Sequence, residues 1–130
     1  MHQPQNEQDE PIAEAGAVIE QLERILASRD FDASRRCRVL LRFLLEETLA
    51  GRPEALTEVA IATRVFGRGM GHDPGLDPIV RIQAGRLRRS LDRYYRRSRP
   101  EDAVRIELPR GTYVPVARRV GEEVGALPAQ

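Results

Sequence analysis

The stretch from Asp77 to Arg97, DPIVRIQAGRLRRSLDRYYRR, constrains the fold more than any other part of the chain. Successive residues of an α-helix are about 100° apart, so apolar residues at this spacing share one side of the helix. The residues on that side are Val80, Ala84, Leu87, Leu91, Tyr94 and Tyr95. Asp77 is a good N-cap and Pro78 fits the first helical position. We therefore predict a helix over 78–97 with one buried face.

The opposite side of this helix is unusually basic. It carries Arg81, Ile82, Gly85, Arg86, Arg88, Arg89, Arg93 and Arg96, and Arg97 follows at the end of the helix. A solvated helix face usually mixes both signs of charge, but Asp92 is the only acid between positions 81 and 99. Gly85 costs about 1 kcal/mol of helix stability relative to Ala, which close approach of a ligand would explain. The face suits a polyanion with grooves.

Charge is distributed unevenly along the chain, although the net charge is only +1. Residues 1–34 carry two Arg against eight acids, residues 35–99 carry fifteen Arg against seven acids, and residues 100–130 carry four Arg against five acids. The middle segment therefore has a net charge of +8 and is the part expected to meet an acidic partner.

Length and composition limit the possible classes of protein. A chain of 130 residues suffices for one domain with a modest core and tails. No apolar run approaches a membrane span and the N-terminus does not read as a secretory signal, so we expect a cytoplasmic, nucleoid-associated protein without a membrane partner. Cys37 is the single cysteine and is interpreted as a small buried side chain.

The N-terminal third is predicted to contain a polar tail and two helices. Residues 1–11 read as a disordered tail. Residues 12–28 form a first helix whose apolar stripe either docks on the core or pairs with a second subunit. Ser34 caps a second helix that runs to about residue 50 and stops at Gly51.

The remaining elements predict a basic helix between a loop and a hairpin. Thr57 caps a short helix over 58–66, and the Gly-rich segment 67–76 forms a loop. Beyond the basic helix, alternation predicts strands at 104–108 and 112–116, joined through Gly111 in a hairpin that spans 103–118. Residues 120–130 read as a flexible tail. The fold class is mainly α with a small β-hairpin, in the order of a winged helix-turn-helix with an extra N-terminal helix, forming one domain over 12–119.

The runs IVRIQAGRLRRSL and RIELPRGTYVPV resemble the recognition helix and wing of OmpR/PhoB-type DNA-binding domains. The matching positions are Val80, Ile82, Arg86, Leu87, Arg88, Arg89 and Leu91, then Ile106, Pro109, Arg110, Gly111 and Tyr113. Residues 35–118 also look like a bacterial winged-helix domain that occurs ahead of tetratricopeptide or cyclase modules. OmpR/PhoB-type domains begin with a small sheet, which nothing before Leu56 predicts here.

These features predict a sequence-specific DNA-binding protein that regulates transcription as a homodimer on double-stranded DNA, with RNA polymerase or another transcription factor as a further partner. Base reading is assigned to Arg81, Ile82, Gly85, Arg86 and Arg89, because Arg pairs with guanine and an apolar side chain meets a thymine methyl. Contacts to phosphate or the minor groove are assigned to Arg88, Arg93, Arg96, Arg97 and Arg110.

Two other classes of function compete with DNA binding. The fold could serve as a protein-interaction adaptor without specific DNA binding, since fold does not fix function. Catalysis is not expected: the only candidate constellation is His72, Asp73 and Asp77, which also reads as loop and cap chemistry. No cofactor or metal site is predicted. No sequence pattern predicts the operator, the sign of regulation, the regulated genes or any effector.

Overall fold

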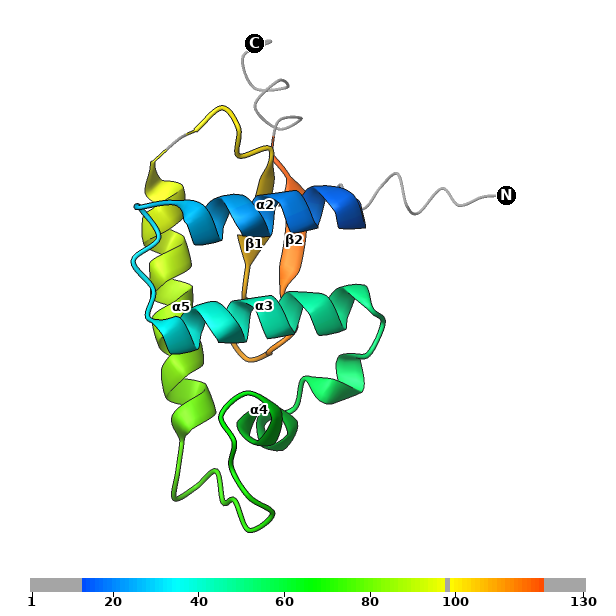
Figure 1. Cartoon of the computed structure of the whole chain (residues 1–130), viewed down its shortest axis with the longest axis vertical. Coiled ribbons are helices and arrows are strands. Elements are labelled where there is room, and N and C mark those ends of the chain that lie inside the picture. The colour runs from blue at the N-terminus through cyan, green and yellow to red at the C-terminus, as the bar shows by residue number, and fades with distance from the viewer. Residues whose placement is uncertain (1–12, 98, 121–130) are drawn as a thin grey trace, which may run out of the picture.

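The computed structural model describes residues 13–97 and 99–120 and is mainly helical with a small two-stranded antiparallel sheet (Figure 1). The elements in order are helices α2 (Ala15–Ala27) and α3 (Arg35–Leu49), a 3-10 turn η1 (Pro53–Ala55), helices α4 (Glu58–Arg64) and α5 (Ile79–Arg96), and strands β1 (Val104–Glu107) and β2 (Val116–Arg119). This confirms the coarse fold class. The predicted tails lie outside the described residues, apart from Val120. Within the described part, no helix is both long and apolar enough to span a bilayer.

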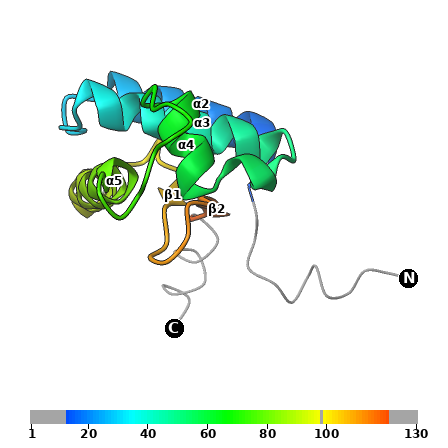
Figure 2. The ribbon, with the colours of Figure 1, turned by 90° about the horizontal axis from the view of Figure 1, so that it is seen from below.

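The elements form two layers around one apolar cluster. Helices α2 and α3 lie side by side in one layer, and α5 and the β1–β2 hairpin lie beneath them (Figures 1 and 2). Short helix α4 packs against α5 near the N-terminal end of that helix. The helices and strand β1 turn their apolar sides inward, as the helical and strand periodicities require. The layer arrangement leaves the polar side of α5 facing away from the core.

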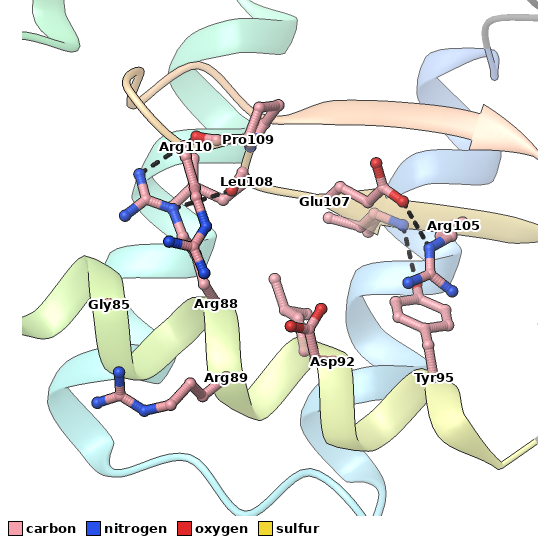
Figure 3. Close-up of a pocket in the computed structure, with 12 residues that line it drawn as sticks. Gly85, Arg88, Arg89, Asp92, Tyr95, Arg105, Glu107, Leu108, Pro109 and Arg110 are labelled. Atoms are coloured by element: carbon pink, nitrogen blue, oxygen red, sulfur yellow. Dashed lines mark hydrogen bonds and ion pairs between the residues drawn. The ribbon is translucent and has the colours of Figure 1, made fainter.

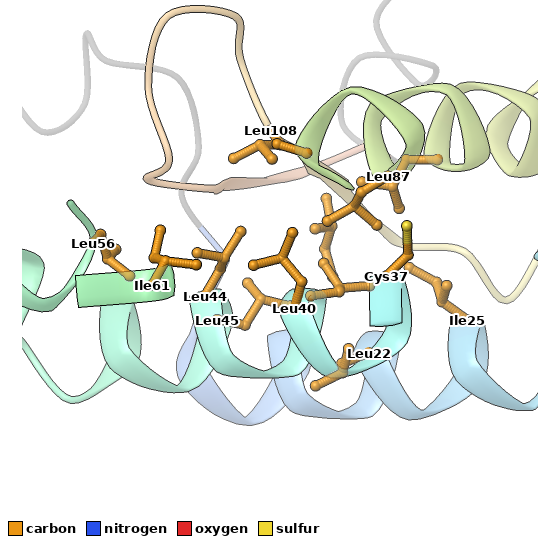
Figure 4. Close-up of a cluster of buried hydrophobic side chains, with 14 of the residues drawn as sticks. Leu22, Ile25, Cys37, Leu40, Leu44, Leu45, Leu56, Ile61, Leu87 and Leu108 are labelled. Atoms are coloured by element: carbon orange, nitrogen blue, oxygen red, sulfur yellow. The ribbon is translucent and has the colours of Figure 1, made fainter. Parts of the chain in front are cut away.

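Helices α2, α3, α4 and α5 and strand β1 each contribute fully buried side chains to the core (Figure 4). Leu22 and Ile25 come from α2, Leu40 and Leu44 from α3, and Leu87 from α5, and all five have no exposed surface. Ile61 of α4 and Ile106 of β1 extend the cluster at the two sides. The apolar face predicted for α5 is confirmed, since Val80, Ala84, Leu91 and Tyr94 are also buried.

Helix α2 packs on its own chain. The predicted stripe is buried at Val18, Leu22 and Ile25, and Gln21 beside it is fully buried as well. Ile19 lies on the outer side and is 37% exposed. The sequence left open whether this stripe packs on its own core or pairs with a second subunit. In the structure it packs on its own core.

Several predicted helix ends are confirmed by their capping groups. The Ser34 side chain accepts a hydrogen bond from the Cys37 amide at 3.2 Å, and Thr57 accepts one from the Ala60 amide at 3.1 Å. Gly51 and Gly67 follow α3 and α4 with φ of +76° and +68°, the left-handed backbone that favours glycine after a helix. Buried Cys37 places its Sγ 3.5 Å from the Gln83 carbonyl, in agreement with the structural role expected for it.

Helix α5 begins one residue later than predicted. Pro78 occupies the N-cap position and no side chain caps the helix, whereas Asp77 was expected to do so. The reason lies in the preceding loop, where Arg68 Nε donates to the Asp77 carboxylate at 2.8 Å. This hydrogen bond also lowers the pKa of Asp77. The carboxylate therefore ties the loop to the start of the helix.

The second strand of the hairpin was placed too early. It was predicted at 112–116 but runs from Val116 to Arg119, with Glu107 opposite Val116 and Val104 opposite Arg119. Pro115 has no N–H to donate to a ladder, so pairing starts only after it. The connection therefore spans 108–115, and Gly111 adopts φ of +83°, as a turn glycine was expected to.

A polar network joins the C-terminal half of α5 to the other layer. Gln21 Nε2 donates to Asp102 Oδ1 at 2.8 Å, and the Tyr94 hydroxyl donates to the same oxygen at 2.9 Å. Tyr95 accepts the Ile106 amide at 2.9 Å, and its burial raises its pKa to about 12. Arg99 stacks over the Tyr94 ring, 3.9 Å from its centroid. These contacts fix the orientation of α5 relative to α2 and β1.

Candidate functional site

The outer face of α5 carries the side chains that the sequence singled out. Arg81, Ile82, Arg86, Arg89, Arg93 and Arg96 are exposed on this helix and Arg97 is exposed at its end, while Gly85 and Arg88 are half-buried. Ile82 is 46% exposed, although large apolar side chains on α5 are otherwise buried. The helix is held rigidly by its other face, so these groups are presented on a fixed support.

Three of these arginines are committed to carboxylates. Arg81 Nε donates to Glu58 of α4 at 3.0 Å and its Nη2 donates to the Pro74 carbonyl at 2.5 Å. Arg93 forms a two-pronged pair with Asp32 at 2.9 and 3.1 Å. Arg97 lies 3.6 Å from Asp30. Their charges are therefore partly neutralised by acids of neighbouring segments.

Neighbouring arginines lower the pKa values of the two aspartates between α2 and α3. The hydrogen bond from Arg93 lowers the pKa of Asp32, and the hydrogen bond from Arg99 lowers the pKa of Asp30. Both carboxylates therefore offset part of the positive charge of the arginines they contact. The C-terminal half of α5 presents less net positive charge than the sequence of that segment indicates.

Arg88 makes a different kind of contact, to the backbone of the hairpin connection. Its Nε donates to the Leu108 carbonyl at 3.0 Å, and its Nη2 donates to the carbonyls of Pro109 and Thr112 at 3.2 and 3.0 Å. The sequence assigned Arg88 to phosphate, and this clamp was missed. The sequence could have indicated an intramolecular contact, because Arg88 lies at the edge of the buried stripe, next to Leu87 and three residues before Leu91.

In the part of the chain that the structure describes, the other arginines of this face, and Arg110 of the hairpin connection, make no contacts of this kind. Arg86, Arg89, Arg96 and Arg110 have no hydrogen-bond or ion-pair partner within the described residues. The guanidinium of Arg89 extends back along the helix towards Gly85, where an added Cβ would lie 3.7 Å from Arg89 Nη1. Gly85 therefore has ordinary room for a methyl group, and its value would lie in leaving the helix surface open to a ligand.

A cleft of about 310 Å³ separates α5 from the hairpin connection (Figure 3). Arg88 and Arg110 lie between the helix and the connection, and Gly85 and Arg89 line the cleft on the helix side. Asp92 is the acid of α5 in this cleft, and Glu107 is paired with Arg105 at 2.6 Å. The structure thus brings together Gly85, Arg88, Arg89 and Arg110 from two segments about twenty residues apart.

The first turn of α3 adds two arginines that the sequence analysis did not assign. Ser34 and Cys37 of this turn line a hollow of about 260 Å³ together with Arg86, Arg89 and Arg93 of α5. Arg35 and Arg36 occupy the same turn, are exposed and have no partner within residues 13–97 and 99–120. The sequence could have indicated them, because Arg35 and Arg36 directly follow Ser34, the residue predicted to cap the helix.

Two of the three candidate catalytic residues, Asp73 and Asp77, make structural contacts in the loop before α5. Asp73 Oδ1 accepts the Gly75 amide at 2.9 Å, and Asp77 is held by Arg68. The His72 ring is 3% exposed, with Nδ1 3.7 Å from Asp77 Oδ2. Among the described residues, no group of three or more His, Cys, Asp or Glu side chains is placed to hold a metal ion.

Comparison with known proteins adds no relative to these observations. No protein-family model, curated protein or solved structure matches the chain.

Proposed function

We propose that the protein is a sequence-specific DNA-binding transcriptional regulator of the winged helix-turn-helix class. In this proposal α5 is the recognition helix, α4 is the helix before it, and the β1–β2 hairpin is the wing. The single observation that carries the proposal is the outer face of α5, where Arg86 and Arg89 are uncommitted beside Gly85 and exposed Ile82. An α-helix of this kind fits the major groove.

The proposal divides the basic residues by what they can reach. Arg86 and Arg89 have free guanidinium groups for bidentate contacts to guanine, with Ile82 available for a thymine methyl and Gly85 for close approach. Arg81 could read a base only after releasing Glu58, so we consider it a weaker candidate for base contacts than Arg86 and Arg89. Arg96 and Arg110 are assigned to phosphate or the minor groove, together with Arg35 and Arg36.

Arg93 and Arg97 are weaker candidates for phosphate than their positions in the sequence indicate. Each already faces an aspartate, Asp32 or Asp30, that lies in the segment before α3. A phosphate contact by either residue would have to replace that pair or share it. Their contribution to binding is therefore expected to be smaller than that of Arg89 or Arg110.

A homodimer on DNA remains part of the proposal, because a single recognition helix buries little surface and specific sites usually take two modules. The stripe on α2 is not available for that contact, since Val18, Leu22 and Ile25 are buried in their own chain. We therefore expect the two copies to meet through another surface or to be brought together by adjacent half-sites.

An adaptor that binds protein is the second candidate. The observation that favours it is the exposure of apolar side chains on α4 and the loop after it: Val59 is 53% exposed, Leu76 85% and Met70 fully. RNA polymerase or another transcription factor would be the partner in a regulator that uses both surfaces. DNA binding that does not depend on sequence would favour the adaptor alone.

Titration of labelled duplex at several salt concentrations tests the proposal. If about five phosphates are neutralised, the logarithm of the association constant should fall against the logarithm of salt concentration with a slope near −4 to −5. Selection of bound fragments from random DNA then supplies the operator. Absence of binding at low salt would end the DNA proposal.

A further inference from the structure

The hairpin connection, residues 108–115, depends on donors from outside itself. Pro109 and Pro115 have no N–H to donate, and Gly111 adopts φ of +83° at the turn. The Val114 amide is used locally, donating to Thr112 Oγ1 at 3.1 Å. Strand pairing stops at Glu107 and Val116, so the ladder does not order the connection.

The guanidinium of Arg88 supplies those donors from α5. It reaches carbonyls on both sides of the turn, at Leu108 and Pro109 before Gly111 and at Thr112 after it, over 3.0 to 3.2 Å. Hydrogen bonds from a charged donor are stronger than neutral ones, and the planar fork of Arg can bridge two segments. Figure 3 shows Arg88 rising from α5 to the connection that carries Arg110.

We propose that Arg88 is a positioning residue: it fixes the hairpin connection, and with it Arg110, in one place relative to the outer face of α5. The inference rests on the proposed DNA-binding function and deepens it, because the helix and the wing then meet DNA as one preorganised surface. Ordering the connection before binding removes an entropic cost that binding would otherwise carry. Arg88 itself touches the hairpin backbone and not the nucleic acid.

A lysine at this position separates positioning from direct phosphate contact. Lys keeps the charge but places one compact ammonium group at the end of a flexible chain, so it does not reproduce the fork. A phosphate contact would be largely retained in Arg88→Lys. Positioning would be lost in Arg88→Lys nearly as fully as in Arg88→Gln, which gives a second variant without the charge.

The first measurement uses the free protein and does not depend on DNA. NMR order parameters of the backbone amides in the segment 108–115 should fall from about 0.85 towards 0.6 in Arg88→Lys, because the hydrogen bonds that Arg88 donates to the carbonyls of this segment are lost. Arg96→Lys is the matched control, because Arg96 is on the same helix and has no partner within the described residues. Unchanged order parameters in both Arg88 variants would overturn the clamp.

The second measurement is a double-mutant cycle on operator DNA with Arg110→Ala. If Arg88 acts through the connection, Arg88→Lys should weaken binding about tenfold in the wild-type background and much less in the Arg110→Ala background. The salt slope should be the same for Arg88→Lys and wild type, because no phosphate contact is removed. Additive losses would overturn the positioning role.

The two measurements keep this inference distinct from the proposed function. If the wild-type chain binds no DNA, the proposed function fails and the positioning role in recognition fails with it, while the order parameters of the free protein still decide whether Arg88 orders the hairpin. If the wild type binds DNA and the order parameters of 108–115 are the same in Arg88→Lys and wild type, only the inference about Arg88 fails.

Discussion

At the scale of single residues, the arginines of this protein differ mainly in what already occupies their guanidinium groups. Arg38 illustrates a purely structural use, with donations to the carbonyls of Leu26, Phe31 and Ala33 at 2.8 to 3.0 Å. Arg89 and Arg110 illustrate the opposite case, exposed and without partners in the part of the chain that the structure describes. The free arginines are the ones whose removal should affect binding without affecting folding.

Arg89→Ala should weaken binding to the operator by about 1–3 kcal/mol and relax preference at one base pair, because a bidentate contact to a base is lost. Scrambled duplex should be affected less. Arg42→Ala is a matched control, since Arg42 pairs with Glu23 across α2 and α3 and lies away from the proposed surface. Equal losses on the operator and on scrambled duplex would remove Arg89 from the base-reading role.

Arg110→Ala should differ in kind from Arg89→Ala. Its loss should weaken operator and scrambled duplex by similar factors and reduce the magnitude of the salt slope by about one, as expected for a phosphate contact. Neither change should alter the free energy of unfolding by more than about half a kcal/mol, because both side chains are exposed. Binding by Arg110→Ala that equals wild type at every salt concentration would show that the hairpin does not touch DNA.

At the scale of elements, the segment between α2 and α3 links the N-terminal helix to the end of α5 through charge. Asp32 pairs with Arg93, and Asp30 pairs with Arg99 at 2.6 Å. Their folded-state pKa values lie below the ordinary value of 3.8 because of these arginines. The stabilisation is therefore fully present at pH values well above 3.8 and is lost as the pH falls through the lowered folded-state values.

We expect the free energy of unfolding to fall on acidification below about pH 4, and Asp32→Asn to show a smaller fall than wild type because it cannot lose the Arg93 ion pair by protonation. Urea unfolding at pH 7, pH 4 and pH 2.5 measures this. Asp92→Asn is the control, since Asp92 is exposed on α5 with no ion-pair partner among the described side chains. An identical acid dependence in Asp32→Asn and wild type would contradict the assignment.

At the scale of the whole molecule, α2 is an integral part of the core. Leu22 has no exposed surface and packs within the same cluster as Leu40, Leu87 and Ile106. Leu22→Ala should lower the free energy of unfolding by about 2–5 kcal/mol, because it leaves a cavity that the surroundings fill incompletely. Ile19→Ala, on the outer side of the same helix, should cost well under half as much.

Urea unfolding of the two variants checks this prediction. Sedimentation of Leu22→Ala under folding conditions adds a test of assembly: its association state should equal that of wild type, because the buried side of α2 does not contact a second copy. Loss of dimers in Leu22→Ala with unchanged stability would instead place the stripe in a subunit interface.

Local signals were sufficient for much of the fold. Ser34, Thr57, Gly51 and Gly67 set helix ends through groups within a few residues along the chain, so the sequence alone located them. The buried stripe of α5 followed from helical periodicity. By contrast, the capping role predicted for Asp77 was wrong, because Arg68 binds its carboxylate. The predicted start of β2 was also wrong, because Pro115 has no N–H and strand pairing begins only after it.

The sequence by itself determined that one face of the α5 helix is basic and that a hairpin with Arg110 follows it, because charge and periodicity are properties of neighbouring residues. Only the tertiary structure decided which arginines are free. Asp32, Asp30 and the carbonyls of the hairpin connection lie twenty to sixty-nine positions from the arginines they engage. Partners at that distance are brought together by packing of the two layers, which no local pattern encodes.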